Sequence, residues 1–419
     1  MSLPSLDHYD PMDPATQQDP FPSYAALREQ APVWQGRGGI YFVSRHDAIV
    51  EVLRQPNIFS SQWGVSAGAP SVPGAEAETR EIMSGGYPAV STMLTLDPPL
   101  QTRYRKSVGK AFSTRRIESM EARIRQRVQE LLEPWPARGR VDFMRQLSVP
   151  LPVRVIADFL SIPLEREADV KRWSDDSVAA LGVELTRDRA LDAARGIVEM
   201  QHFLASLFEA RQREPRDDFL SELVAAEFED ATGQVRKLEI PEMLSIVQQL
   251  MVAGNEAMTK GVNEIMKLLV QHPPEWKRIQ EDPSAIPAMV DEGLRLASPN
   301  QGLFRICKED AVVAGVAIPK KARLWVMFGS GNRDERVFPE PDRFDPGRPN
   351  LKESLAFGRG AHFCIGAPLA RLEIRVLYEE LAKQLESVDF APGTRLEYEP
   401  SFILRGLKAL EVDVVRKGA

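Results

Sequence analysis

The chain carries a cysteine in a setting typical of a reactive thiolate. Cys364 lies in the segment 357–366, which reads FGRGAHFCIG. Glycines on both sides of the thiol allow the backbone to turn tightly around the sulfur. A helix is predicted from Ala367 to about Leu385, and its N-terminal N–H groups would stabilise a negative sulfur. The segment therefore favours a metal-bound thiolate.

The sequence does not show the further cysteine or histidine ligands that a zinc site at Cys364 would need. A tetrahedral zinc site needs four ligands, and Cys364 has no cysteine or histidine at ligand spacing. The chain's other histidines are His8, His46, His202 and His272. A single sulfur ligand suits the axial position of haem iron.

The segment around Cys364 resembles the haem-binding loop of the cytochrome P450 family, F-x-x-G-x-[HR]-x-C-x-G. The matching residues are Phe357, Gly360, His362, Cys364 and Gly366. The resemblance implies a mainly α fold with a minor β region, the cytochrome P450 fold, in a single large domain. It also implies haem b (iron protoporphyrin IX) with Cys364 as the thiolate ligand, and a loop in which Phe357, Gly358 and Gly366 contact the haem. The implied activity is a monooxygenase that inserts one oxygen atom of O2 into a substrate.

Two further segments match the family in the expected order. Glu292-Gly293-Leu294-Arg295 resembles E-x-x-R, and Pro341-Asp342-Arg343-Phe344 follows at the usual place. The resemblance implies that Glu292, Arg295 and Arg343 form a buried charge triad. Buried charges persist only when they are paired, so we assign the triad a structural role.

The haem propionates need cationic partners, preferably bidentate ones. By resemblance these partners are Arg105, Arg305 and His362. Many members of the family carry histidine where this chain has Gln101, so we expect a weaker contact at that position.

A long apolar helix is predicted from Pro241 to about Gln271. Its centre resembles the family's oxygen-activating segment A-G-x-[DE]-T-T, and Ala253, Gly254 and Glu256 match, but Ala257 replaces the usual threonine. In the family that hydroxyl helps to hold a proton-delivering water at the haem. Thr259 is about 200° around the helix and cannot take its place. We expect water or a substrate hydroxyl to complete the relay, with Glu256 supplying protons.

The resemblance implies electrons from a separate ferredoxin and its reductase, because the chain shows no nucleotide-binding glycine fingerprint. Between Arg103 and Arg127, nine basic residues stand against Glu118 and Glu121, a local charge of +7. A solvated helix face is the simplest interpretation, and a docking surface for an acidic partner is the alternative. We expect ferredoxin to dock near Arg103 to Arg116, together with Arg359, Arg371 and Arg375.

Substrate contacts are expected from the stretch 62–91, which is rich in Gly, Pro and Ser and is a candidate lid, and from the central helix at Ala253. The other positions that resemble the family's recognition segments are Pro299, Asn300, Leu303, Phe402 and Ile403. Most are apolar, which suits a lipophilic small molecule, although core packing explains each of them equally well.

The predicted organisation is one domain, residues 1–419, without internal repeats. We expect a β-rich part at about 32–62, 303–327 and 396–415, and a helical part at about 97–300 and 367–385.

Composition excludes several classes of protein. The formal net charge of −7 over 419 residues argues against nucleic-acid binding. No apolar run approaches the roughly 20 residues of a membrane span, so we expect no membrane insertion. Met1 to Pro14 lacks a signal-peptide core, and two cysteines fit a reducing compartment, which together predict a cytoplasmic protein. We expect the protein to be a monomer.

Two other functions remain compatible with this sequence. The loss of threonine at Ala257 is also compatible with a haem-thiolate peroxygenase or isomerase that needs no electron supply. A non-catalytic haem-based binding or sensor protein is the alternative from outside the enzymes.

Overall fold

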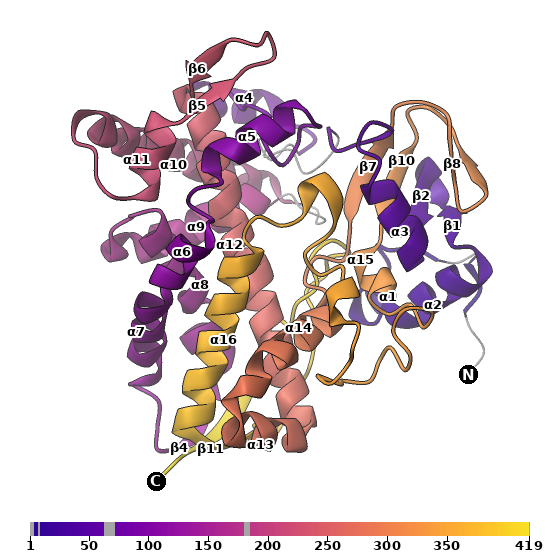
Figure 1. Ribbon diagram of the computed structural model, residues 1–419, viewed down its shortest axis with the longest axis vertical. Helices are drawn as coiled ribbons and strands as arrows, with labels where there is room; N and C mark the ends of the chain where they lie inside the picture. Colours follow the sequence, from indigo (N-terminus) through magenta and orange to yellow (C-terminus); the bar gives the residue numbers. More distant parts are fainter. Residues whose placement is uncertain (1–3, 7–8, 63–71, 180–184, 419) are drawn as a thin grey trace. The chain divides into compact units, whose positions relative to one another are not determined.

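The computed structural model describes residues 4–6, 9–62, 72–179 and 185–418. The chain is mainly helical with a minor β region, as the sequence predicts (Figure 1). Its contacts divide it into unit 1, residues 1–59, 117–152 and 257–419, and unit 2, residues 60–116 and 153–256. The segments of the two units alternate along the chain, so neither unit is a continuous piece of the single domain expected from the sequence.

Three helices contribute to both units. They are α6 (Thr114–Ser119), α8 (Pro150–Phe159) and α12 (Ile240–Gln271). The helices of unit 1 are α1 (Pro14–Gln18), α2 (Phe21–Gln30), α3 (His46–Leu53), α7 (Glu121–Leu132), α13 (Pro273–Glu281), α14 (Ile286–Ala297), α15 (Phe328–Gly331) and α16 (Ala367–Gln384). Those of unit 2 are α4 (Glu76–Ser84), α5 (Leu100–Val108), α9 (Glu167–Val178), α10 (Arg187–Arg213) and α11 (Phe219–Ala225). None of the helices in the described part of the chain has the length and hydropathy that a bilayer span requires.

A five-stranded sheet forms the β region of unit 1, in the order β1-β2-β10-β7-β3. Its strands are β1 (Val33–Gln35), β2 (Ile40–Val43), β10 (Arg323–Val326), β7 (Leu303–Cys307) and β3 (Phe59–Ser60). β2 pairs in parallel with β10, and β10 pairs antiparallel with β7. Because strand side chains alternate, Leu324 and Val326 pack with Ile49 of α3 on one face, and Trp325 packs with Phe42 on the other.

The smaller strands depart from the predicted boundaries. β11 (Leu385–Phe390), β12 (Glu411–Arg416) and β4 (Arg138–Asp142) form an antiparallel sheet in the order β11-β12-β4, so the last β region begins at Leu385 and not near residue 396. The hairpins are β5 (Glu227–Glu229) with β6 (Val235–Lys237), and β8 (Ala311–Val313) with β9 (Val316–Ile318). Short strands such as β4 are easily missed, because their partners lie far away in sequence.

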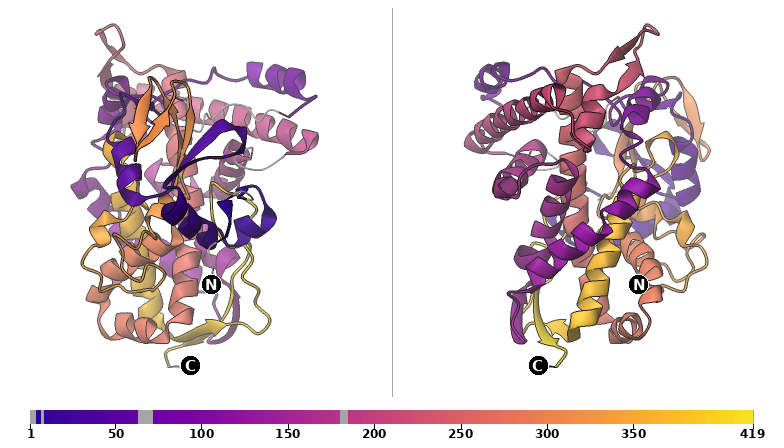
Figure 2. Two further views of the ribbon diagram at one scale, coloured as in Figure 1. Left: turned by 90° about the vertical axis from the view of Figure 1, so that its right-hand side faces the viewer. Right: turned by 60° about the vertical axis from the view of Figure 1, so that its left-hand side comes forward.

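The candidate lid is not an irregular loop throughout. Residues 76–84 form α4, which packs against α10 in unit 2 (Figure 2), and Glu78 accepts a hydrogen bond from Arg187 of α10. Residues 63–71 of the same stretch lie outside the described residues. The expectation of an irregular loop was wrong at 76–84, because charged helix formers at 76–81 outweigh the nearby Gly and Pro, and the role of this stretch as a lid stays a prediction.

Helices α7 and α16 lie side by side in unit 1 and are joined by ion pairs (Figure 1). Arg125 of α7 binds Glu379 at 2.6 Å and Glu380 at 2.8 Å, and Arg375 of α16 binds Glu121 at 2.6 Å. These contacts hold α16, and α16 begins just after Cys364.

Candidate functional site

Cys364 lies at the end of a closed loop in unit 1. The N–H of Cys364 donates to the carbonyl oxygen of Phe357 at 2.9 Å, and the N–H of Phe363 donates to that of Gly360 at 3.1 Å. Gly366 is the N-cap residue of α16, with proline in the first turn. The loop therefore presents a half-buried thiol, which forms no disulfide, at the N-terminus of an 18-residue helix.

Two glycines are required by the shape of this loop, and a third, Gly366, lies beside the sulfur. Gly358 and Gly360 have φ angles of +66° and +72°, which side-chain-bearing residues rarely adopt. A Cβ atom on Gly360 would lie 2.3 Å from the carbonyl oxygen of Leu53 in α3, and one on Gly366 would lie 3.8 Å from Sγ of Cys364. Glycine at these positions keeps the loop against α3 and leaves one flank of the sulfur uncovered.

The second cysteine has a different environment. Cys307 is fully buried, and its Sγ donates a hydrogen bond to the carbonyl oxygen of Glu309 at 2.9 Å. Burial raises the pKa of the Cys307 thiol, so it stays protonated and inert. Of the two thiols, only Cys364 is placed for ligation.

The donor set around Cys364 fits a cofactor that brings its own equatorial ligands. Among the described residues, no group of three or more His, Cys, Asp or Glu side chains could hold a metal ion. A lone sulfur at a helix N-terminus with a glycine-lined flank suits an iron porphyrin, whose ring already supplies four nitrogen ligands. The residues present therefore fit haem.

The residues predicted to contact the propionates lie on three elements. His362 is in the short helix Gly360–His362 before Cys364, and Arg305 is on β7, where its Nη1 donates to the carbonyl oxygen of Phe304 at 2.7 Å. Gln101 and Arg105 are on α5 in unit 2 and, four residues apart, share one face of that helix. Their contact with haem stays a prediction.

The centre of α12 is helical throughout, as predicted. A Cβ atom on Gly254 would lie 3.3 Å from Ile156 of α8, so glycine permits a close approach of these two helices in unit 2. Oγ1 of Thr259 donates to the carbonyl oxygen of Ser148 at 3.0 Å. The Thr259 hydroxyl is thus already engaged and cannot replace the hydroxyl that Ala257 lacks.

The two segments predicted to contact substrate in unit 1 lie together. The N–H of Gln301 donates to Ile403 at 2.8 Å, that of Arg405 donates to Pro299 at 2.9 Å, and Asn300 pairs with Leu404. Leu303 is half-buried at the start of β7.

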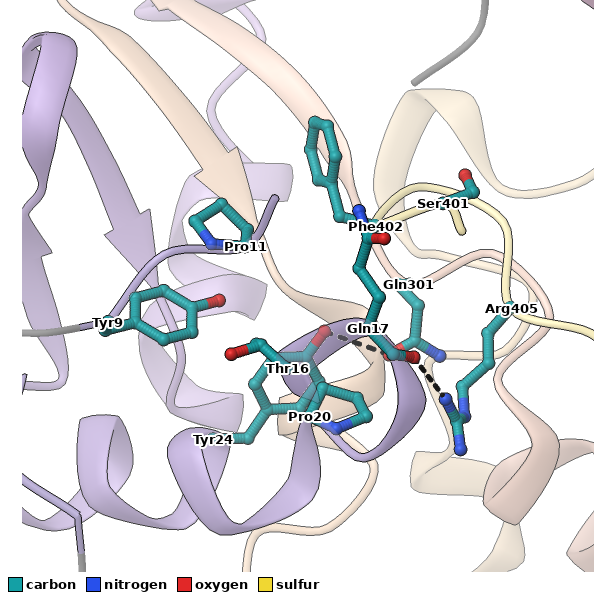
Figure 3. A pocket seen from close by; sticks show the side chains of 10 residues that line it. All are labelled: Tyr9, Pro11, Thr16, Gln17, Pro20, Tyr24, Gln301, Ser401, Phe402 and Arg405. Atoms are coloured by element: carbon teal, nitrogen blue, oxygen red, sulfur yellow. Dashed lines mark hydrogen bonds between the residues drawn. The ribbon is translucent and has the colours of Figure 1, made fainter. Parts of the chain in front are cut away.

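The side chains of Phe402 and Ile403 have different environments. Ile403 is buried in a cluster with Trp325 and Met327, and its role as a substrate contact stays a prediction. Phe402 is half-buried against the same cluster and lines a pocket with Tyr9, Gln17 and other residues, shown in Figure 3.

The predicted charge triad needs one correction. Glu292 binds Arg295 at 2.6 Å as expected, but its other cationic partner is Arg348, not Arg343. The Arg343 side chain is 59% exposed and pairs with Glu340 at 3.0 Å. The chain turns at Asp345, whose carboxylate accepts from the N–H of Gly347, and this turn directs Arg348 inward. The Asp-Pro-Gly signal of that turn was present in the sequence.

Comparisons with known proteins agree with this geometry. The family model described as Cytochrome P450 matches residues 191–394. The vitamin D(3) 25-hydroxylase of Pseudonocardia autotrophica is 34% identical over 96% of this chain and 95% of its own length. The 6-deoxyerythronolide B hydroxylase of Saccharopolyspora erythraea is 32% identical over 94% of this chain and 96% of its own length.

Solved structures share the whole fold. A cytochrome P450 from Chondromyces apiculatus is 33% identical and has a TM-score of 0.84 over 98% of this chain and 99% of its own. A Bacillus megaterium protein solved in complex with testosterone is 30% identical and has a TM-score of 0.80 over 96% of this chain and 100% of its own. With the thiol of Cys364 at the N-terminus of α16, this chain belongs to the cytochrome P450 family of haem-thiolate monooxygenases.

Proposed function

We propose that this monooxygenase hydroxylates a lipophilic small molecule with electrons delivered by a separate ferredoxin and its reductase. The observation that carries the proposal is the lone half-buried thiol of Cys364 on its glycine-shaped loop at the start of α16. Haem bound through Cys364 supplies the activation of O2, with the thiolate donating electron density. The remaining tasks belong to the chain's own residues.

Binding of the haem propionates is assigned to Arg105, Arg305 and His362, with a weaker contact from Gln101. Guanidinium groups match carboxylates with two parallel hydrogen bonds, which fixes the orientation of the group they hold. Phe357, Gly358 and Gly366 shape the loop around the sulfur, and the glycines leave space that a side chain would fill.

Protons are assigned to Glu256, which is half-buried on α12. Ala257 follows it and has no hydroxyl, and the Thr259 hydroxyl donates to Ser148. A hydroxyl group of the substrate, or a water that the substrate holds, therefore completes the path from Glu256. This assignment predicts a substrate that carries a hydroxyl near its site of oxidation.

Two observations support a lipophilic substrate: the names of similar proteins, and the apolar residues among the expected substrate contacts. The names of similar proteins include a vitamin D(3) 25-hydroxylase and a linalool 8-monooxygenase, and one solved relative is bound to testosterone. Pro299, Leu303 and Phe402 offer apolar surface, and Asn300 among them adds one polar group. A few polar groups in an apolar lining orient a ligand of this class.

Docking of ferredoxin is assigned to three cations of unit 2. Among the residues that the structure describes, Lys106, Lys110 and Arg115 are exposed and form no ion pair. The other expected docking residues are partly neutralised by carboxylates at 2.6 to 3.5 Å: Arg103 by Glu229, Arg116 by Asp217, Arg359 by Glu353, Arg371 by Asp291 and Arg375 by Glu121. Unpaired exposed cations attract an acidic partner most strongly.

The test compares two cysteine variants. After reduction and addition of carbon monoxide, the wild type and Cys307→Ala should show the red-shifted Soret band peculiar to thiolate-ligated haem, and Cys364→Ser should lose it. Lipophilic compounds that shift the Soret band are then offered with ferredoxin and reductase, or with hydrogen peroxide alone. Product only with peroxide would replace this proposal by a peroxygenase, and a normal carbon monoxide spectrum in Cys364→Ser would remove its basis.

A further inference from the structure

Helix α9 contacts helix α12 in unit 2 through a hydrogen bond between polar side chains. Both helices are labelled in Figure 1. Nε2 of the buried Gln248 donates to Oγ of Ser177 at 3.0 Å. Seven residues are about two helical turns, so Asn255 lies on the same face of α12 as Gln248. Ser174 lies one turn before Ser177 on α9. We define the polar seam as Ser174 and Ser177 of α9 together with Gln248 and Asn255 of α12.

Two members of the polar seam carry buried polar atoms that have no hydrogen-bond partner among the described residues. The Asn255 side chain is 2% exposed, and neither its Oδ1 nor its Nδ2 has a hydrogen-bond partner among the described residues. Oγ of Ser174 is likewise buried and lacks a partner in the described part of the chain. Buried polar groups are nearly always satisfied, and where protein groups are missing, ordered water takes their place. Three such polar atoms along one helix contact are sufficient to hold water between the helices.

A carboxylate follows each of these residues in sequence. Glu256 follows Asn255 on α12, and Asp175 follows Ser174 on α9. Asp175 forms an ion pair with Lys171, one turn earlier, and its side chain remains 42% exposed, in contact with solvent. Asp175 is thus in contact with solvent, Glu256 is half-buried on α12, and the charge of Glu256 acts on Asp175.

The charges around Asp175 favour its protonation. Burial raises its pKa, the hydrogen bond and charge of Lys171 lower it, and the charges of Glu256 and Asp176 raise it again, with a net upward shift. The charged groups that act on Asp175 are Lys171 and Asp176 of α9 and Glu256 of α12. The other charged residues of α9 are Glu167, Asp169 and Arg172, and Asp169 and Arg172 pair with each other. Asp176 is compensated by Arg189 at 2.6 Å, which leaves Glu256 and Lys171 as the groups that control Asp175.

We propose that Asp175 is the relay residue that passes protons from solvent to Glu256, through water held by Asn255 and Ser174. This inference rests on the proposed function, in which Glu256 supplies protons. Each turnover consumes O2, two electrons from ferredoxin and two protons, and yields one hydroxylated product and one water. For each proton, the Asp175 carboxyl releases H⁺ to the seam water, the water passes H⁺ to the Glu256 carboxylate, and solvent reprotonates Asp175.

If Asp175 had only a structural role, its substitution would reduce the stability of the protein. Its ion pair with Lys171 is an exposed contact within one helix, and such pairs contribute little to stability. Asp175→Asn should therefore fold normally. Asp192→Asn is the matched control, because Asp192 is an exposed carboxylate on α10 that pairs within its helix with Arg195 at 2.7 Å.

The first measurement follows ferredoxin-driven O2 consumption in the presence of testosterone as the lipophilic probe, since O2 reduction needs protons whether or not the probe is oxidised. Asp175→Asn should slow it on the order of tenfold with a larger solvent deuterium isotope effect, and Asp175→Glu should restore it. Consumption of hydrogen peroxide, which brings its own protons, should not change. An Asp175→Asn rate equal to that of the wild type, or an equal loss in Asp192→Asn or with peroxide, would overturn the inference.

The second measurement needs no turnover. The infrared carboxyl band that disappears in Asp175→Asn should titrate at lower pH in Glu256→Gln than in the wild type, because the charge of Glu256 raises the pKa of Asp175. An unchanged midpoint would refute the coupling. Failure of the wild type to accept electrons from ferredoxin would instead refute the proposed function, and the infrared titration would still decide the inference.

Discussion

Nε of Arg348 lies 3.0 Å from Oε1 of Glu292, in the buried position that the sequence pattern assigns to Arg343. Arg348 also donates to the backbone carbonyl oxygens of Glu340 and Arg343, at 2.6 and 2.9 Å. The segment that contains Arg343 is therefore held by Arg348 through its backbone, while the Arg343 side chain faces solvent. Glu292 is fully buried, so its charge depends on Arg295 and Arg348.

This relationship predicts unequal effects of the two arginines on stability. Arg348→Ala should lower the free energy of unfolding by about 3–5 kcal/mol, because it leaves a buried carboxylate with one partner removed. Arg343→Ala should change it by less than about 1 kcal/mol, since exposed ion pairs contribute little. Urea unfolding of both variants gives the comparison. Equal losses would contradict the assignment of Arg348 as the buried partner.

Substitution of a glycine in the Cys364 loop by alanine should cost more stability than the same substitution at a glycine with open space around it. Gly393→Ala should cost about 1–2 kcal/mol, because its φ of +87° is unfavourable but nothing lies within 4 Å of the added Cβ. Gly360→Ala carries the same backbone penalty and adds an overlap with the carbonyl oxygen of Leu53. We expect a larger loss of stability and less haem per protein chain for Gly360→Ala. Equal haem content in the two variants would show that the loop tolerates a side chain there.

Glu373 on α16 predicts a fall in stability with rising pH. Burial raises its pKa from 4.5 to about 8, and its Oε1 has no hydrogen-bond partner among the described residues. The folded protein therefore holds a proton that the unfolded chain releases. The free energy of unfolding that this proton contributes is fully present below pH 4.5. It falls by about 1.4 kcal/mol per pH unit between pH 4.5 and about pH 8.

Urea unfolding at several pH values between 5 and 8 measures this slope. Glu373→Gln should remove it. Glu380→Gln on the same helix should leave the slope unchanged. Hydrogen bonds from Gln129 and Arg125 outweigh burial and lower the pKa of Glu380. The stability that Glu380 contributes is therefore lost only at acidic pH, below the usual pKa of a glutamate. The same slope in the wild type and in Glu373→Gln would refute the prediction.

Charge reversal should locate the ferredoxin docking surface. The double variant Lys106→Glu with Arg115→Glu should slow association with ferredoxin about tenfold at low ionic strength, with a smaller effect at high salt. The control Lys277→Glu with Lys320→Glu changes the net charge equally at two other exposed lysines. Stopped-flow association rates decide between them. If both pairs slow association equally, net charge and not a local surface controls docking.

Ala257→Thr tests the assistance expected from the substrate. A threonine hydroxyl competes with a substrate hydroxyl for the water near Glu256, so product formed per O2 consumed should fall with the native substrate. A substrate analogue without that hydroxyl should be oxidised better by Ala257→Thr than by the wild type. Unchanged or improved coupling with the native substrate would exclude substrate assistance.

The sequence was sufficient for features that depend on neighbouring residues. The Cys364 loop, the N-terminus of α16 and the long helix α12 follow from glycine spacing, proline placement and apolar periodicity, all of which act within a few turns. The choice of Arg348 over Arg343 as the partner of Glu292 depends instead on residues that are distant in sequence. Both arginines are compatible with the local pattern, and only the turn at Asp345 together with the position of Glu292 on α14 selects one of them.

The amino-acid sequence by itself determined the thiolate ligand, the helix that carries Glu256 and the absence of a hydroxyl at Ala257, because each is a property of residue type at a fixed local position. Only the tertiary structure decided which charges are neutralised, that Ile403 packs with Trp325 and Met327, and that Gln248 of α12 contacts Ser177 of α9. Pairing and burial depend on segments distant in the chain, and the free energy of such contacts is not encoded in any single segment.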